Sequence, residues 1–118
     1  MFNFFSKKKS EGMGSLPAND AVRTKLSEMG DDGSAARHVI HFAFPLGAAT
    51  VEDVAAIKRH LTKLGFKVKN SVSEAGLSFE NHQPVIGEEF DLLTRNLAQF
   101  FDQYDWEYDG WECAVVAN

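Results

Sequence analysis

The sequence has very little cysteine, little proline and no long hydrophobic run. Its single cysteine, Cys113, has no partner for an internal disulfide, which excludes a disulfide-stabilised scaffold and favours a reducing compartment. No apolar segment approaches the roughly eighteen residues of a membrane-spanning helix. Near the N-terminus the lysines follow the apolar residues, which is the reverse of a secretory signal. We therefore expect a cytoplasmic protein without stable membrane anchoring.

The chain is short, and its composition is that of an ordinary globular protein. Its 118 residues are enough for one domain. Hydrophobic residues make up 44% and charged residues 25%, so a core can form without disulfides or a metal ion. Residues 1–19 contain lysine, serine, glycine and proline, and most of this stretch lacks hydrophobic periodicity, which predicts a flexible leader. The single domain is expected to span residues 20–118.

Negative charge is concentrated near the C-terminus. The formal net charge of the whole chain is −5, which argues against broad binding to a nucleic-acid backbone. The segment from Glu88 to Asn118 holds eight carboxylates and one base, Arg95, and so has a net charge of −7. An acidic surface commonly keeps a protein soluble. A more specific interpretation is that this acidic surface attracts a basic segment of a partner protein.

Hydrophobic periodicity predicts the order helix, strand, helix, strand, strand, helix, strand. After the leading helix, this is the split βαβ pattern of an α+β, ferredoxin-like fold, in which two helices cover one face of a four-stranded antiparallel sheet. The leading helix is then an extra N-terminal element, with Asp20 as its cap. The predicted segments are about Asp20–Met29, Arg37–Phe44, Thr50–Leu64, Phe66–Val72, Leu77 to Phe79 or Val85, Gly87–Tyr104 and Trp106–Val116.

The last predicted strand changes its alternation at Asp109-Gly110. One extra residue there, a β-bulge, would bring the aromatic residues and Cys113 to one face of the strand and the acidic residues to the other. A tight Asp-Gly hairpin is the competing interpretation, but its first arm would have only about three residues. We favour the bulge. It predicts that Trp106, Tyr108, Trp111, Cys113 and Val115 face inward, and that Glu107, Asp109 and Glu112 face outward.

The sequence shows little sign of catalytic or metal chemistry. The four histidines, His38, His41, His60 and His82, have no standard metal-binding spacing, and His38 and His41 should face opposite sides of their strand. Burial is the expected role of Cys113. The sequence contains no phosphate-binding loop, nucleophile elbow or catalytic triad motif. We therefore predict a protein that is not an enzyme and that uses no metal and no cofactor.

Nucleic-acid binding is considered because RNA-recognition domains use this fold and stack bases on aromatic residues of the sheet. We expect Val39, His41 and Ala43 to line the open face of the first strand, which lacks an aromatic pair. A small-ligand or RNA-binding module on that face is the alternative function, and it predicts that His41→Ala weakens binding. The basic residues of the second helix are explained by the helix dipole, which favours cations near a helix C-terminus.

Three segments resemble the regulator of ribonuclease activity B family, whose members are bacterial protein inhibitors of ribonuclease E. They are Asp32–Ser34 with the strand Arg37–Phe44, the segment Val54–Val68, and Phe101–Trp111, whose Glu107–Trp111 portion is the most specific. The resemblance spans about Asp20 to Cys113. It implies a ferredoxin-like core, no catalytic activity and an endoribonuclease partner in RNA degradation.

The resemblance also implies a protein–protein inhibitor that does not contact nucleic acid directly. From their positions, we expect the partner-binding carboxylates to contact a basic segment of the nuclease; they are Asp102, Asp105, Glu107, Asp109 and Glu112. A structural role, setting and packing the bulge, is expected of Tyr108, Gly110 and Trp111.

Overall fold

A computed structural model describes residues 2–3, 16–70 and 76–117. Helices and a β-sheet are both present, which confirms the predicted α+β class. In chain order the elements are β1 (Phe2–Asn3), α1 (Leu16–Glu28), β2 (Arg37–Pro45), α2 (Val51–Lys63), β3 (Lys67–Asn70), β4 (Leu77–Gln83), α3 (Glu88–Asp102) and β5 (Trp106–Cys113).

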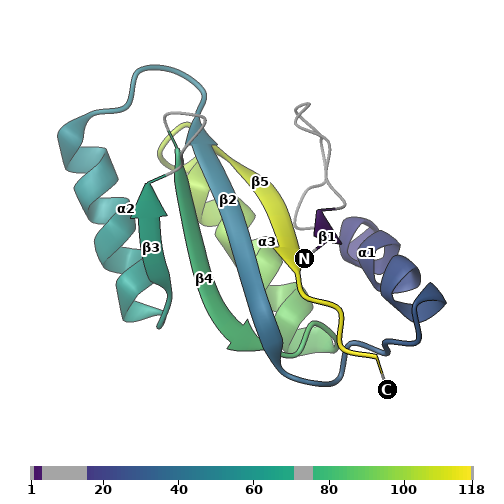
Figure 1. Ribbon diagram of the computed structural model, residues 1–118. Coiled ribbons are helices and arrows are strands. Elements are labelled where there is room, and N and C mark those ends of the chain that lie inside the picture. Colours follow the sequence, from purple (N-terminus) through teal and green to yellow (C-terminus); the bar gives the residue numbers. More distant parts are fainter. Residues whose placement is uncertain (1, 4–15, 71–75, 118) are drawn as a thin grey trace.

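The strands form one antiparallel sheet in the order β1-β5-β2-β4-β3. Four strands make up most of it, because β1 contributes only two residues at the edge beside β5. Helix α2 connects β2 to β3, and α3 connects β4 to β5, so each connection passes over one intervening strand. In Figure 1, α3 lies behind the sheet, α2 lies beside β3 at one side of the sheet, and α1 lies near the β5 edge.

Local sequence signals explain where the two sheet-covering helices begin. The Thr50 hydroxyl accepts a hydrogen bond from the Asp53 backbone N–H at 3.1 Å, which confirms the predicted cap of α2. The first turn of α3 carries Glu88, Glu89 and Asp91, where the positive end of the helix dipole stabilises carboxylates. The apolar stripes that follow face the sheet.

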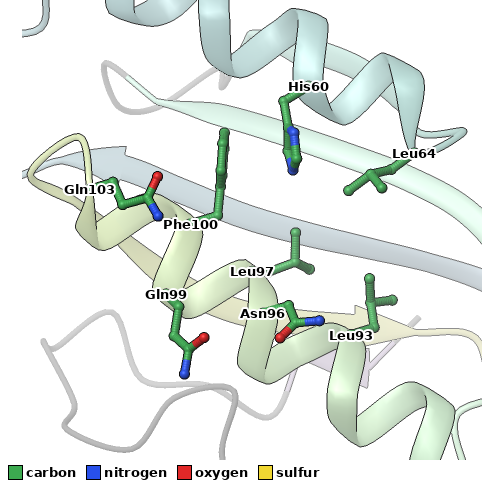
Figure 2. A pocket seen from close by; sticks show the side chains of 8 residues that line it. All are labelled: His60, Leu64, Leu93, Asn96, Leu97, Gln99, Phe100 and Gln103. Atoms are coloured by element: carbon green, nitrogen blue, oxygen red, sulfur yellow. The ribbon is translucent and has the colours of Figure 1, made fainter.

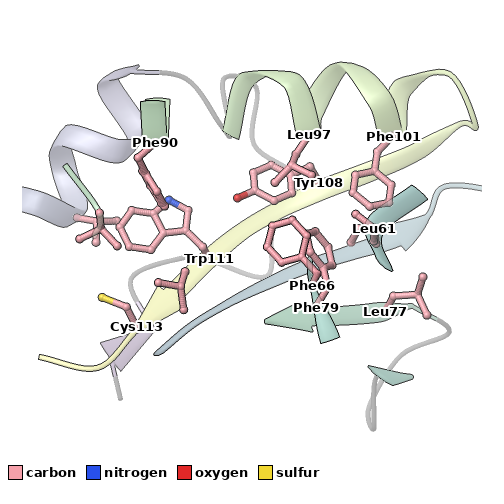
Figure 3. Close-up of a cluster of buried hydrophobic side chains, with 14 of the residues drawn as sticks. Leu61, Phe66, Leu77, Phe79, Phe90, Leu97, Phe101, Tyr108, Trp111 and Cys113 are labelled. Carbon is pink, nitrogen blue, oxygen red and sulfur yellow. The ribbon is translucent and has the colours of Figure 1, made fainter. Parts of the chain in front are cut away.

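The core lies between the helices and one face of the sheet (Figure 3). Alternate residues of β2 are buried from Arg37 to Ala43, as expected for a strand with one covered face. Large aromatic side chains fill much of this layer, among them Phe79, Phe101, Trp106 and Trp111, which are almost completely inaccessible to solvent. Cys113 is buried in the same cluster, as predicted.

The structure corrects the start of the first helix. Helix α1 begins at Leu16, inside the predicted leader, so Asp20 lies within the helix and does not cap it. Pro17 explains the earlier start, because proline is well suited to a first helical turn, where its missing N–H breaks no hydrogen bond. Strand β1 also lies within the predicted leader. Residues 4–15 of the leader, and the predicted end of β3 at Val72, fall outside the described residues.

Candidate functional site: the acidic strand and its surroundings

Strand β5 contains the predicted bulge. Its register along β2 places Gly110 opposite Phe42 and Tyr108 opposite Ala43, which leaves Asp109 as the extra residue. Gly110 has a φ of +95°, a conformation that a side chain at Cβ disfavours. Trp106, Tyr108 and Trp111 are all buried in the core, which confirms the prediction that the bulge brings these aromatic residues to the inward face.

The five predicted partner-binding carboxylates are not equally accessible. Asp102 ends α3 and Asp105 lies in the turn before β5, and both side chains are exposed. Glu107 and Glu112 are half-buried on the sheet face opposite the helices, opposite Phe44 and Ile40 in the β2 register. Asp109 is only 8% exposed, so it is not an accessible carboxylate. As the extra residue of the bulge, it is displaced from the regular alternation of the strand.

Asp102 and Asp105 are exposed carboxylates at the turn between α3 and β5. Asp102 lies at the C-terminal end of α3, where the helix dipole repels a carboxylate and where the last turn contains no basic residue. Asp105 adopts a φ of +59°, which aspartate tolerates better than most residues do, and its carbonyl accepts a hydrogen bond from Leu46 N–H at 3.0 Å. Within the described part of the chain, neither carboxylate forms an ion pair.

The face of β2 that the helices leave uncovered is not the predicted one but the opposite face. Val39, His41 and Ala43 are buried under the helices, whereas Ile40, Phe42 and Phe44 are half-buried on the other face. The prediction was wrong because an isolated alternating strand does not reveal which of its two apolar faces the helices cover. His38 does lie on the face opposite His41, as expected, and its Nε2 lies 3.0 Å from Glu80 Oε1.

His41 is a buried member of the aromatic core. Its Nδ1 lies 2.7 Å from the Tyr108 hydroxyl, and its ring stacks on Phe79 with a centroid distance of 5.1 Å. Its other nitrogen, Nε2, has no hydrogen-bond partner among the described residues. Burial lowers the pKa of His41 to about 3, because the cation would have no water around it. Burial also raises the pKa of Tyr108 well above its usual value. The pair is therefore neutral in the folded protein at neutral pH.

A buried polar network connects α1 and α3 to the bulged strand. Trp111 Nε1 donates to Asn19 Oδ1 at 2.9 Å, and Asn19 Nδ2 donates to Asp91 Oδ1 at 3.0 Å and to Thr94 Oγ1 at 2.8 Å. Burial raises the pKa of Asp91, but the hydrogen bonds from Arg23 and Asn19 outweigh it and leave the pKa lowered. Asn19 lies in the predicted leader, so this network was not predicted. The predicted burial of Trp111 could have indicated it, because a buried indole N–H needs a hydrogen-bond acceptor nearby.

A second buried network attaches the end of the chain to the domain. Arg37 donates to both carboxylate oxygens of Asp31, at 2.6 and 2.8 Å, and both side chains are fully buried. Val116 N–H also donates to Asp31, at 2.9 Å, and Arg37 donates to the Ala114 carbonyl at 3.1 Å. The hydrogen bonds from Arg37 hold the pKa of Asp31 well below its usual range. The network thus fixes the residues that follow β5.

A groove lies on the helical side of the molecule, between α2 and α3 (Figure 2). Its volume is about 370 Å³. Figure 2 shows His60 and Leu64 pointing from α2 towards α3, and the ring of Phe100 rising from α3 beside His60. The two rings stack with a centroid distance of 4.0 Å. The lining residues are His60, Leu64, Leu93, Asn96, Leu97, Gln99, Phe100 and Gln103. This groove was not predicted from the sequence.

Among the described residues, no group of three or more histidine, cysteine or acidic side chains has an arrangement that could hold a metal ion. None of the described helices is both long enough and apolar enough to cross a membrane. The surface features described above are acidic residues at the α3–β5 turn, a partly apolar sheet face and a groove between two helices. They belong to an α+β domain.

Comparison with protein families identifies the kind of domain. The family model for regulator of ribonuclease activity B matches residues 17–113, which is most of the chain. The chain therefore belongs to the regulator of ribonuclease activity B family. The matched region begins with α1 and ends with the bulged strand, so it includes both buried networks apart from Ala114 and Val116. No curated protein matches the sequence closely enough to count as a relative.

Proposed function

We propose that this protein is a non-enzymatic cytoplasmic regulator that binds an endoribonuclease of the ribonuclease E type and lowers its cleavage of RNA. Membership of a family of ribonuclease regulators is the observation that carries this proposal. The strand order β5-β2-β4-β3, with two helical crossovers, supports a ferredoxin-like core to which α1 is an extra N-terminal helix.

The acidic surface at the α3–β5 turn is the proposed contact for a basic segment of the nuclease. It consists of the exposed Asp102 and Asp105 and of the half-buried Glu107 and Glu112. Exposed carboxylates without an ion pair are available to arginine or lysine at little cost in desolvation. Asp109 contributes less direct contact because it is buried. The bulge residues Tyr108, Gly110 and Trp111 support this surface from the core side.

Neutralising the accessible carboxylates tests the proposal. The variant Asp102→Asn/Asp105→Asn/Glu107→Gln/Glu112→Gln should bind ribonuclease E about tenfold more weakly at low salt, because several favourable charge pairs are lost. Titration calorimetry at two salt concentrations would measure this, and an RNA cleavage assay would show whether inhibition falls in parallel. The matched control is Glu28→Gln/Glu52→Gln, which neutralises exposed carboxylates elsewhere. Equal affinity of the folded four-residue variant and the wild type would reject the surface, whereas no binding by the wild type would reject the partner.

RNA binding on the open sheet face is the second candidate function. The observation that favours it is the half-buried pair Phe42 and Phe44 on that face, since aromatic residues of a sheet can stack on bases. Lys67 and Lys69 add positive charge along β3, whereas Glu107 and Glu112 along β5 would repel phosphates. Weaker binding of single-stranded RNA by Phe42→Ala, with nuclease affinity unchanged, would favour this function over the first.

A further inference from the structure

The loop between β2 and α2 is an exposed apolar segment. Residues 46–52 form the longest run of consecutive exposed positions in the described part of the chain. Leu46 is 44% exposed and Val51 is 82% exposed, and the sequence has no charged residue between them. A continuous apolar segment on a surface is typical of an interaction site, whereas single exposed apolar residues are ordinary. The other large exposed apolar side chains of the described residues lie outside this loop; they are Leu64, Ile86 and Leu92.

The loop begins beside the acidic residues of the α3–β5 turn. Leu46 N–H donates to the Asp105 carbonyl at 3.0 Å, and Pro45 lies opposite Trp106 in the strand register. The Asp105 carboxylate lies against Gly47, with Oδ2 3.8 Å from the position that a Cβ atom would occupy there. In Figure 1 the loop leaves β2 at the end of the sheet where this turn also lies. The apolar loop is therefore continuous with the acidic surface of the proposed function.

A hollow of about 340 Å³ lies at the other end of the loop, on the first turns of α2. Its lining is mostly apolar and consists of Ala49, Thr50, Val51, Val54, Ala55 and Lys58. The cap of α2, in which Thr50 accepts a hydrogen bond from Asp53 N–H, fixes this end of the loop. The hydrogen bond from Leu46 to Asp105 fixes the other end. A surface held at both ends loses little conformational entropy when a ligand binds to it.

The charges along this surface give it a direction. At the α3–β5 turn, Asp102 and Asp105 are exposed, and neither forms an ion pair within the residues that the structure describes. At the far end, Glu52 and Asp53 lie in the first turn of α2, where the helix dipole stabilises them, and Lys58 lines the hollow. Both signs of charge are thus present at the α2 end, whereas the charges of the turn are negative. A cation of a ligand fits the turn, and an uncharged side chain fits the loop.

We propose that the acidic turn and the apolar loop together bind a segment of the partner protein in which apolar side chains adjoin basic ones. The basic side chains pair with Asp102 and Asp105, and the apolar side chains cover Leu46 and Val51. Leu46 and Val51 are five residues apart and so at most about 17 Å from each other, which a short extended segment can span. The inference rests on the proposed function and adds a requirement to it: the nuclease segment must be apolar as well as basic.

Two peptides of equal charge test the proposal. The leucine peptide has three central arginines with two leucines on each side, so that it can bind in either chain direction. The serine peptide has serine in place of every leucine. Fluorescence anisotropy at low salt measures the affinity of the full chain for each labelled peptide, and amide NMR shifts locate the bound peptide. We expect the wild type to bind the leucine peptide about fivefold more tightly, because apolar area leaves water, with shifts mainly in residues 45–53 and 102–107.

Two variants separate the apolar contribution from the charge contribution. The loop variant Leu46→Gln/Val51→Thr should lose the preference for the leucine peptide and keep the wild-type affinity for the serine peptide, because only apolar contacts are removed. The turn variant Asp102→Asn/Asp105→Asn should weaken binding of both peptides by a similar factor, about threefold. Asparagine tolerates the positive φ of residue 105, and all four positions are exposed, so both variants should fold. Circular dichroism checks this.

The control variant Leu64→Gln/Leu92→Gln removes two exposed leucines outside the loop and should keep the wild-type preference. Equal affinity of the wild type for the two peptides would overturn the inference, and so would an unchanged preference in the loop variant. If the turn variant still weakens both peptides in either case, the acidic contact of the proposed function stands and only the apolar requirement fails. Absence of binding by both peptides would also overturn the inference, and the proposed function would then depend on the titration with ribonuclease E.

Discussion

The buried pair His41 and Tyr108 should make the stability of the protein depend on pH. In the folded state the imidazole lies among Phe66, Phe79 and Phe90, and burial lowers its pKa to about 3. In the unfolded chain it should titrate near its ordinary value of about 6.5. Between these values the unfolded chain binds a proton that the folded protein does not. The stabilisation is therefore complete above about pH 6.5 and is lost as the pH falls towards 3.

The size of the effect follows from the two pKa values. Lowering the pH from 7.5 to 5 should reduce the free energy of unfolding by about 2 kcal/mol through His41 alone. That is a large part of the roughly 5–15 kcal/mol by which small domains are stable. Exposed carboxylates should contribute less over this range, because they remain mostly ionised above about pH 5.

Urea unfolding at pH 7.5 and pH 5, followed by tryptophan fluorescence, measures this change. The test variant is His41→Leu/Tyr108→Phe, which removes both hydrogen-bonding groups together and so leaves neither partner unsatisfied. We expect its loss of stability between the two pH values to be about 2 kcal/mol smaller than that of the wild type. The control variant His82→Gln removes an exposed imidazole and should retain the wild-type dependence. If the double variant and the wild type lose equal stability, the buried neutral imidazole is not the cause.

Two further predictions concern the supports of the bulged strand. Gly110→Val should lower the free energy of unfolding by about 1–3 kcal/mol in urea titrations, because valine disfavours the φ of +95°; an unchanged midpoint would contradict the bulge geometry. Asp31→Ala should cost about 3–5 kcal/mol by the same measurement, because it leaves Arg37 buried without its counter-charge. Hydrogen exchange at Val116 should also accelerate, since its N–H loses its acceptor; protection equal to that of the wild type would show that this segment is held by other contacts.

The α+β class and the order of the main helices and strands could be predicted from the sequence because their signals are local. The alternation of β2, the cap at Thr50 and the acidic first turn of α3 each act over a few residues, and each is present in the structure. The phase change at Asp109-Gly110, together with the short first arm of the alternative hairpin, also favoured the bulge that the structure contains.

Three features that were mispredicted or missed depend on contacts between residues far apart in the sequence. Both faces of β2 are apolar, so only the position of the helices decides that His41 is buried and Phe42 is not. The contact between Asn19 and Trp111 joins residues 92 positions apart, and short-range periodicity carries no information about such a contact. The α2–α3 groove was unpredictable for the same reason, because it depends on how closely two helices pack across a sheet.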